Sequence, residues 1–150
     1  MTLTPSKLRE FPNLVVGEFT VTSSETDVYN CIAYAAGDTT RKWWPRVRYF
    51  WPAKARFEES LPAFIEAFVF LGFEPCDAAD LETGFEKVAI FCKDDAPTHA
   101  AKQLPSGRWS SKLGDWEDIE HTLHAVECPV YGEVKQILRR LVDAETGQGP

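Results

Sequence analysis

The sequence predicts an α+β fold in which helices pack on a small antiparallel sheet. Two segments carry apolar residues at helical spacing, and several short apolar or β-branched runs between turn residues are typical of strands. Most of these runs follow one another in the second half of the chain, which favours antiparallel pairing. The length of 150 residues suits one domain. We therefore expect a lead-in over 1–12, a single domain over 13–143 and a disordered tail over 144–150.

The first half of the chain is predicted to hold one strand and one short helix. Residues 13–22, NLVVGEFTVT, are rich in β-branched side chains and predict a strand. The run CIAYAA begins at Cys31 and stops at Gly37, so it predicts a helix whose N-cap is Asn30 or an earlier serine. Residues 38–57 contain two prolines and predict irregular backbone.

The second half is predicted to hold a helix, then a run of strands, then a final helix. Residues 59–72 have apolar side chains at helical spacing and end at a glycine, which predicts a helix. Residues 85–92 predict a largely apolar strand, and residues 98–104 and 108–113 flank a Pro-Ser-Gly turn as a hairpin would. Residues 131–144 place valine, isoleucine and leucine on one helical face and predict a final helix.

Composition narrows the classes of partner and compartment. The net charge of −7 makes nucleic acid an unexpected partner, and no apolar stretch approaches the length of a membrane span. The N-terminus has no apolar signal region, and no two of the four cysteines have CxxC spacing. We therefore expect reduced thiols in a cytoplasmic protein, although a bacterial effector exported without a cleaved signal would have the same pattern.

Cys31 is the cysteine that the sequence places near a helix start. Free N–H groups and the helix dipole at that position stabilise a thiolate, and the same N–H groups can serve as an oxyanion hole. His99 opens a predicted strand and is the candidate base. The alternatives are a buried hydrophobic thiol and a histidine bonded to a backbone carbonyl. The candidates for a third polar member are Ser111, Asp115 and Asp118.

The motif Tyr29–Asn30–Cys31 before a small-residue helix, followed by a strand pair with THAAKQL, resembles the papain-like cysteine peptidases. The resemblance is to the bacterial cell-wall endopeptidases and amidases, which have Tyr-Asp-Cys at a helix start. It implies a papain-like fold with Cys31 as nucleophile and His99 as base. Ser111 falls where that family has an orienting His, Asn or Gln, which is a departure from its pattern.

The chain also resembles a group of uncharacterised bacterial domains. The shared segments are YNCIA, PTHAAKQL with SGRWSSKLG, and WEDIEH, and the resemblance covers most of residues 28–140. It brings no established activity with it.

Two further patterns suggest binding sites. His121, His124 and Cys128 are spaced so that one helical face can hold three zinc ligands, with a solvated helix face as the alternative; we expect no cofactor. Residues 41–56 contain six basic side chains and no acid, interleaved with aromatic residues. This pattern suits a surface that binds a nucleic-acid strand, an anionic ligand or a carbohydrate. The alternative is that the aromatic side chains fill the core and the cations are solvated or paired with acidic residues, and the acidic net charge favours this alternative.

The sequence leads to two functional hypotheses. The first is a thiol hydrolase or acyl transferase that acts on an amide, isopeptide or ester bond of a peptide or small amide. In it, Tyr29, Asn30, Trp43 and Trp44 border the substrate, and at least one tryptophan ring lines a groove that reaches Cys31. The second is a non-catalytic binding module of the immunity or adaptor type that uses residues 41–56. A sulfur close to His99 in an open groove favours the enzyme, and an enclosed sulfur favours the module.

Overall fold

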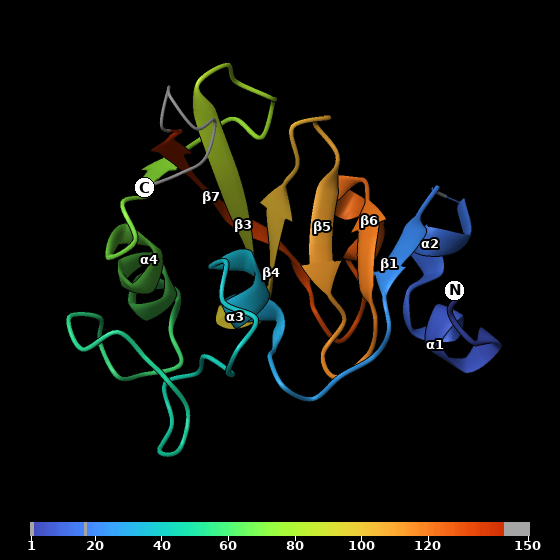
Figure 1. Ribbon diagram of the computed structural model, residues 1–150, viewed down its shortest axis with the longest axis horizontal. Helices are drawn as coiled ribbons and strands as arrows, with labels where there is room; N and C mark the ends of the chain where they lie inside the picture. The colour runs from blue at the N-terminus through green and yellow to red at the C-terminus, as the bar shows by residue number, and fades with distance from the viewer. Residues whose placement is uncertain (1, 17, 143–150) are drawn as a thin grey trace.

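The computed structural model describes residues 2–16 and 18–142, and its centre is an antiparallel sheet (Figure 1). Within those residues the sheet has seven strands in the order β1-β6-β5-β4-β3-β7-β2. The strands are β1 (Thr20–Ser23), β2 (Glu74–Cys76), β3 (Phe85–Lys93), β4 (Ala96–Gln103), β5 (Trp109–Lys112), β6 (Asp118–His121) and β7 (Glu133–Leu141). The helices are α1 (Pro5–Glu10), α2 (Pro12–Val16), α3 (Cys31–Ala35), α4 (Leu61–Val69) and the 3₁₀ helix η1 (Leu123–Val126).

The fold is mainly β, so the predicted papain-like α+β class, with helices packed on a small sheet, is wrong. The decisive difference is the segment 131–144, which was expected to be a helix but contains strand β7. Ile137 and Leu138 are both buried, on opposite faces of the sheet, because β7 lies between β3 and β2 and is covered on both sides. A strand covered on both faces carries consecutive apolar residues, which give the same pattern as a helix.

The N-terminal predictions need a second correction. The expected strand over 13–22 starts as helix α2 and becomes strand β1 only at Thr20. The segment 1–12, expected to be a polar lead-in, contains helix α1 and buries Leu3 and Phe11. These two anchors lie eight positions apart among mostly polar residues, so the segment shows no helical period.

Several predicted elements are confirmed. Helix α4 begins after Ser60, whose hydroxyl accepts the N–H of Ala63, and it buries Phe64 and Phe68 one turn apart. Strand β3 and the β4–β5 hairpin fall where the sequence indicated. The predicted tail over 144–150 lies outside the described residues. No helix in the described part of the chain is long and apolar enough to cross a bilayer.

Side chains from the two faces of the sheet enter separate cores. On the α3 face, sheet residues pack against the helices α3 and α4; the buried set includes Ile32, Phe64, Phe68, Val88, Ile90, Ala100 and Leu138. On the α1 face, sheet residues pack against the N-terminal helices and η1; the buried set includes Leu3, Phe11, Leu14, Phe91, Ala101, Ile119 and Val126. The sheet therefore separates groups that are neighbours along one strand.

The aromatic segment between α3 and α4 has no regular helix or strand, as predicted, and extends away from the sheet (Figure 1). A single bridge joins Trp43 to Phe50, and the indole N–H of Trp51 donates to the carbonyl of Arg56. Trp43 and Trp51 are buried, so the segment is anchored by part of its aromatic content.

Candidate functional site

Cys31 is the first residue of helix α3, and Asn30 sets that position. The Oδ1 atom of Asn30 accepts the N–H of Ala33 at 3.1 Å and the N–H of Trp43 at 3.0 Å. Its Nδ2 atom donates to the carbonyl of Trp43 at 2.8 Å. Asn30 is therefore the N-cap, one of the two alternatives from the sequence, and it ties the helix start to the aromatic segment.

The Cys31 sulfur is enclosed by protein. Cys31 is only 6% exposed, and its thiol donates a hydrogen bond to the carbonyl of Thr98, with a sulfur–oxygen distance of 3.9 Å. Burial raises the pKa of Cys31 to about 11, although backbone N–H groups, chiefly that of Ala100, and the charge of Lys112 oppose the rise. At neutral pH this cysteine is a protonated donor rather than a thiolate.

His99 points away from Cys31. Alternate residues of a strand face opposite sides of a sheet, so Ala100 joins the core around Cys31 while His99 packs against Phe91 and Tyr131 on the α1 face. The ring centroids of His99 and Tyr131 lie 4.0 Å apart and the rings are stacked. Both His99 nitrogens are buried without a partner in the described structure, and burial lowers the His99 pKa well below its usual value.

Ser111 also lies on the α1 face, where it pairs with His121 rather than His99. The Ser111 Oγ and His121 Nε2 atoms are 2.7 Å apart, and His121 Nδ1 lies 2.7 Å from the carbonyl of Thr122. Because a carbonyl only accepts, Nδ1 carries the proton and Ser111 donates to Nε2. Both side chains are fully buried, and burial lowers the pKa of His121 to about 4.

Tyr29, Asp118 and Lys112 form a polar cluster on the α3 face, a combination not predicted from the sequence. The Tyr29 hydroxyl donates to Asp118 Oδ2 at 2.6 Å, and burial, reinforced by that bond, raises the pKa of Tyr29 to about 12. Lys112 stands opposite Asp118 in the β5–β6 register and lies 5.2 Å from the centroid of the Tyr29 ring. Burial lowers the pKa of Lys112. One sequence feature could have predicted this cluster. Ser110 and Lys112 are two residues apart on a strand, so their side chains lie on the same face of the sheet, the α3 face.

The two adjacent tryptophans serve mainly as anchors. Trp43 is buried, and its indole N–H donates to Asp38 at 2.8 Å. Trp44 is half-buried, and its indole N–H donates to Glu59 at 3.1 Å. This is the arrangement expected when the rings fill the core and their N–H groups are paired.

The structure does not put His121, His124 and Cys128 on one helical face. No group of three or more His, Cys, Asp or Glu side chains in the described part of the chain is positioned to hold a metal ion. His121 belongs to strand β6 and is bonded to Ser111, whereas His124 lies in η1 and pairs with Glu127 at 3.1 Å.

A shallow groove borders the outer part of the aromatic segment. We call it the basic groove, and its lining residues are Asp27, Val28, Arg41, Lys42, Arg48, Tyr49 and Phe50. The guanidinium of Arg41 lies 3.6 Å from the centroid of the Phe50 ring. Arg48 is exposed and has a φ of 82°, a backbone conformation that costs about 1–2 kcal/mol for a residue with a Cβ. Three cations and exposed apolar side chains therefore share one surface.

A family model matches residues 20–139, and its description is Domain of unknown function (DUF7689). The chain belongs to this family. No curated protein and no solved structure matches the chain. The DUF7689 domain runs from β1 through most of β7, so it includes Cys31, the polar cluster and the basic groove. Helices α1 and α2 precede it. Nothing in these comparisons links the DUF7689 domain to papain-like peptidases.

Proposed function

We propose that this chain is a non-catalytic binding module whose contact surface is the basic groove, and that its partner is an acidic segment of another protein. The observation that carries the proposal is the combination of an enclosed Cys31 with an exposed set of cations in residues 41–56. Burial of Cys31 keeps its thiol away from solvent and substrate. The exposed cations present positive charge to solvent, where a partner can reach it.

The segment that bears the groove is held firmly from within. Arg46 pairs with Glu59 at 3.1 Å, Arg41 pairs with Asp38 at 2.9 Å, and Trp43 packs on Phe50. These contacts fix the backbone while Arg48 remains exposed and has no ion pair within the described residues. A preorganised surface loses less entropy on binding, which favours a recognition role.

Apolar exposure at the same surface supports a protein partner. Val28, Val47 and Tyr49 are 52%, 81% and 44% exposed, and two of them line the basic groove. Tyrosine and arginine are enriched in protein interfaces because each combines a large contact area with hydrogen bonding. The net charge of −7 disfavours a nucleic acid as the anionic partner.

The alternative is a thiol hydrolase or acyl transferase for an amide, isopeptide or ester. It requires a thiolate that reaches substrate and a base beside it. Burial of Cys31, its pKa of about 11 and the orientation of His99 toward Tyr131 all weigh against that alternative.

The test is fluorescence anisotropy with a labelled peptide of alternating aspartate and leucine residues, and a lysine–leucine peptide as the charge control. We expect saturable binding of the acidic peptide that weakens with added salt. Arg48→Ala and Tyr49→Ala should each reduce affinity by roughly tenfold, as interface arginines and tyrosines often do. Lys93→Ala, at an exposed lysine outside the groove, should not. Equal binding of the two peptides, or equal effects of Arg48→Ala and Lys93→Ala, would rule out the basic groove.

A further inference from the structure

A second concave site lies at the β5–β6 turn, whose residues 113–116 line it. Three aromatic rings, those of Phe11, Trp116 and Tyr131, border a hollow with a cavity volume of about 400 Å³. Leu113, which is 1% exposed, lies at its base. We call this site the aromatic hollow. Its size falls in the range typical of small-ligand pockets.

The three rings meet at different angles. The centroids of Phe11 and Trp116 are 6.3 Å apart with an interplanar angle of 83°. Those of Phe11 and Tyr131 are 5.4 Å apart with an angle of 50°. Phe11 therefore packs against both of the other rings, and all three rings line the same hollow. Aromatic rings attract organic cations that lie over their faces.

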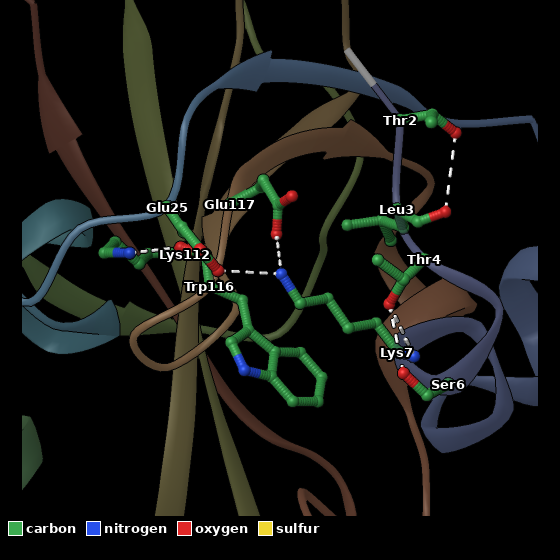
Figure 2. Close-up of polar contacts among 9 residues, drawn as sticks. All are labelled: Thr2, Leu3, Thr4, Ser6, Lys7, Glu25, Lys112, Trp116 and Glu117. Carbon is green, nitrogen blue, oxygen red and sulfur yellow. Dashed lines mark hydrogen bonds and ion pairs between the residues drawn. The ribbon is translucent and has the colours of Figure 1, made fainter.

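The walls are held in place before any ligand arrives. Figure 2 shows the ammonium of Lys7 between Glu117 and Glu25, above the Trp116 indole; the N–O distances are 2.8 and 2.9 Å. These bonds fix α1, and hence Phe11, against the turn that carries Trp116. Tyr131 is fixed from behind by its stacking on His99.

The charged residues that line the hollow are both acidic. Glu10 and Asp115 line it, and no Lys, Arg or His belongs to its lining. Glu10 is exposed and has no ion pair among the described residues. Asp115 is 62% exposed and pairs with Lys42 at 3.2 Å. The Trp116 ring already attracts one cation, since the Lys7 ammonium lies 5.4 Å from its centroid.

We propose that the aromatic hollow binds an organic ammonium group, as carried by a free quaternary amine or by a methylated lysine side chain. The rings attract the charge and bury the methyl groups, and the Glu10 carboxylate, which has no ion pair among the described residues, complements the charge from the rim. Glu10 and Phe11 precede the DUF7689 domain, so the N-terminal helices complete this site. The inference does not rest on the function proposed for the basic groove, although Asp115 of the hollow pairs with Lys42 of the groove.

The test compares choline with 3,3-dimethyl-1-butanol, its neutral carbon isostere, by titration of the Trp116 indole N–H signal in NMR. Choline should give saturable shifts, and the isostere should bind at least several-fold more weakly. A peptide with trimethyl-lysine is titrated in parallel. Tighter binding of the peptide than of choline identifies a methylated lysine as the source of the ammonium group, and tighter binding of choline identifies a free quaternary amine. If the isostere binds as well as choline, or if neither ammonium ligand saturates, the proposal fails.

Variants separate this site from a general effect on folding. Trp116→Leu should weaken choline binding by roughly two- to thirtyfold, measured by calorimetry. Glu10→Gln changes only an exposed carboxylate and should weaken binding several-fold while leaving the fold intact. Glu133→Gln, at an exposed position outside the hollow, is the matched control. If Glu10→Gln and Trp116→Leu both bind choline as wild type does, the ammonium is not in the aromatic hollow.

Discussion

At the scale of single residues, burial decides what the candidate catalytic groups can do. The thiol of Cys31, the imidazole of His99 and the hydroxyl of Ser111 are all nucleophiles or bases in principle. Each is buried, and the structure joins Cys31 to a carbonyl, His99 to an aromatic ring and Ser111 to His121. Their chemistry is therefore that of packed polar groups.

The first residue-scale prediction concerns thiol reactivity. In the native protein, iodoacetamide should modify the half-buried Cys76 and Cys128 before the buried Cys31 and Cys92. Cys31 should react more slowly than a free thiol because burial raises its pKa to about 11. Mass spectrometry of peptides from a time course measures the order. Faster reaction of Cys31 than of a free thiol would instead support the thiol hydrolase.

A second prediction concerns the unpartnered imidazole of His99. His99→Phe keeps a ring that stacks on Tyr131 and removes two buried nitrogens without partners, so it should stabilise the fold by roughly 1–3 kcal/mol. Urea unfolding at neutral pH measures the change. The exposed His124→Gln is the control and should leave stability unchanged.

The same variant should alter the pH dependence of stability. The pKa values of His99 and His121 are lowered in the folded state, so below about pH 6.5 the unfolded chain binds more protons and the wild type loses stability. The loss continues toward the His121 pKa of about 4. His99→Phe should have a shallower slope because one of the two groups is gone. An unchanged slope would contradict this account.

At the scale of elements, the loop before β7 depends on one close approach of two backbones. Gly132 has a φ of 73°, and a Cβ there would lie 2.0 Å from the carbonyl oxygen of Cys92 on β3. Only glycine allows the chain to pass that strand and enter β7 in register. The position of β7 in the sheet therefore depends on Gly132.

Gly132→Ala should therefore be severely destabilising, by more than about 3 kcal/mol, because it adds a clash to the cost of positive φ. Gly114→Ala is the matched control, since Gly114 has a φ of 64° and open space around its Cβ position. It should cost only about 1–2 kcal/mol. Urea unfolding compares the two. Similar losses in both variants would show that the contact with Cys92 relaxes easily.

Whether a helix or strand could be predicted from the sequence depended on how many of its faces are buried against other elements. Helix α4 has one buried face, so Phe64 and Phe68 produced a clear helical period. Strand β7 is covered on both faces, and its adjacent Ile137 and Leu138 removed the alternation that marks a strand. Helix α1 has no fully buried residue: Leu3 and Phe11 anchor it from outside its ends, and its Leu8 is only partly buried, so it shows no helical period.

At the scale of the whole molecule, one sheet supports two cores, and strands β3 and β7 contribute to both. A loss on either face therefore weakens the same strands. The molecule should unfold as a unit rather than face by face.

This prediction is tested with one truncation on each face. Phe64→Ala on the α3 face and Ile119→Ala on the α1 face remove fully buried side chains and should each cost about 2–5 kcal/mol. In both variants, urea curves followed by tryptophan fluorescence and by far-ultraviolet circular dichroism should coincide. Two separate transitions in either variant would show that the cores are independent.

The sequence by itself determined the local features of this protein. The helix start near Cys31, the helix within residues 59–72 and the β4–β5 hairpin depend on neighbouring residues, whose spacing is visible in the chain; the structure then chose Asn30 as the N-cap. The concentration of cations in residues 41–56 is likewise a property of composition.

Only the tertiary structure decided which side of the sheet each candidate residue faces. Side chains on a strand alternate, so a shift of one residue in the expected strand phase moves a histidine from one core to the other. That alternation sends His99 to Tyr131 and leaves Cys31 beside Ala100 and Lys112. The aromatic hollow joins residues 10–11 to residues 113–116 and 130–131, and such long-range contacts arise from packing, which local spacing does not record.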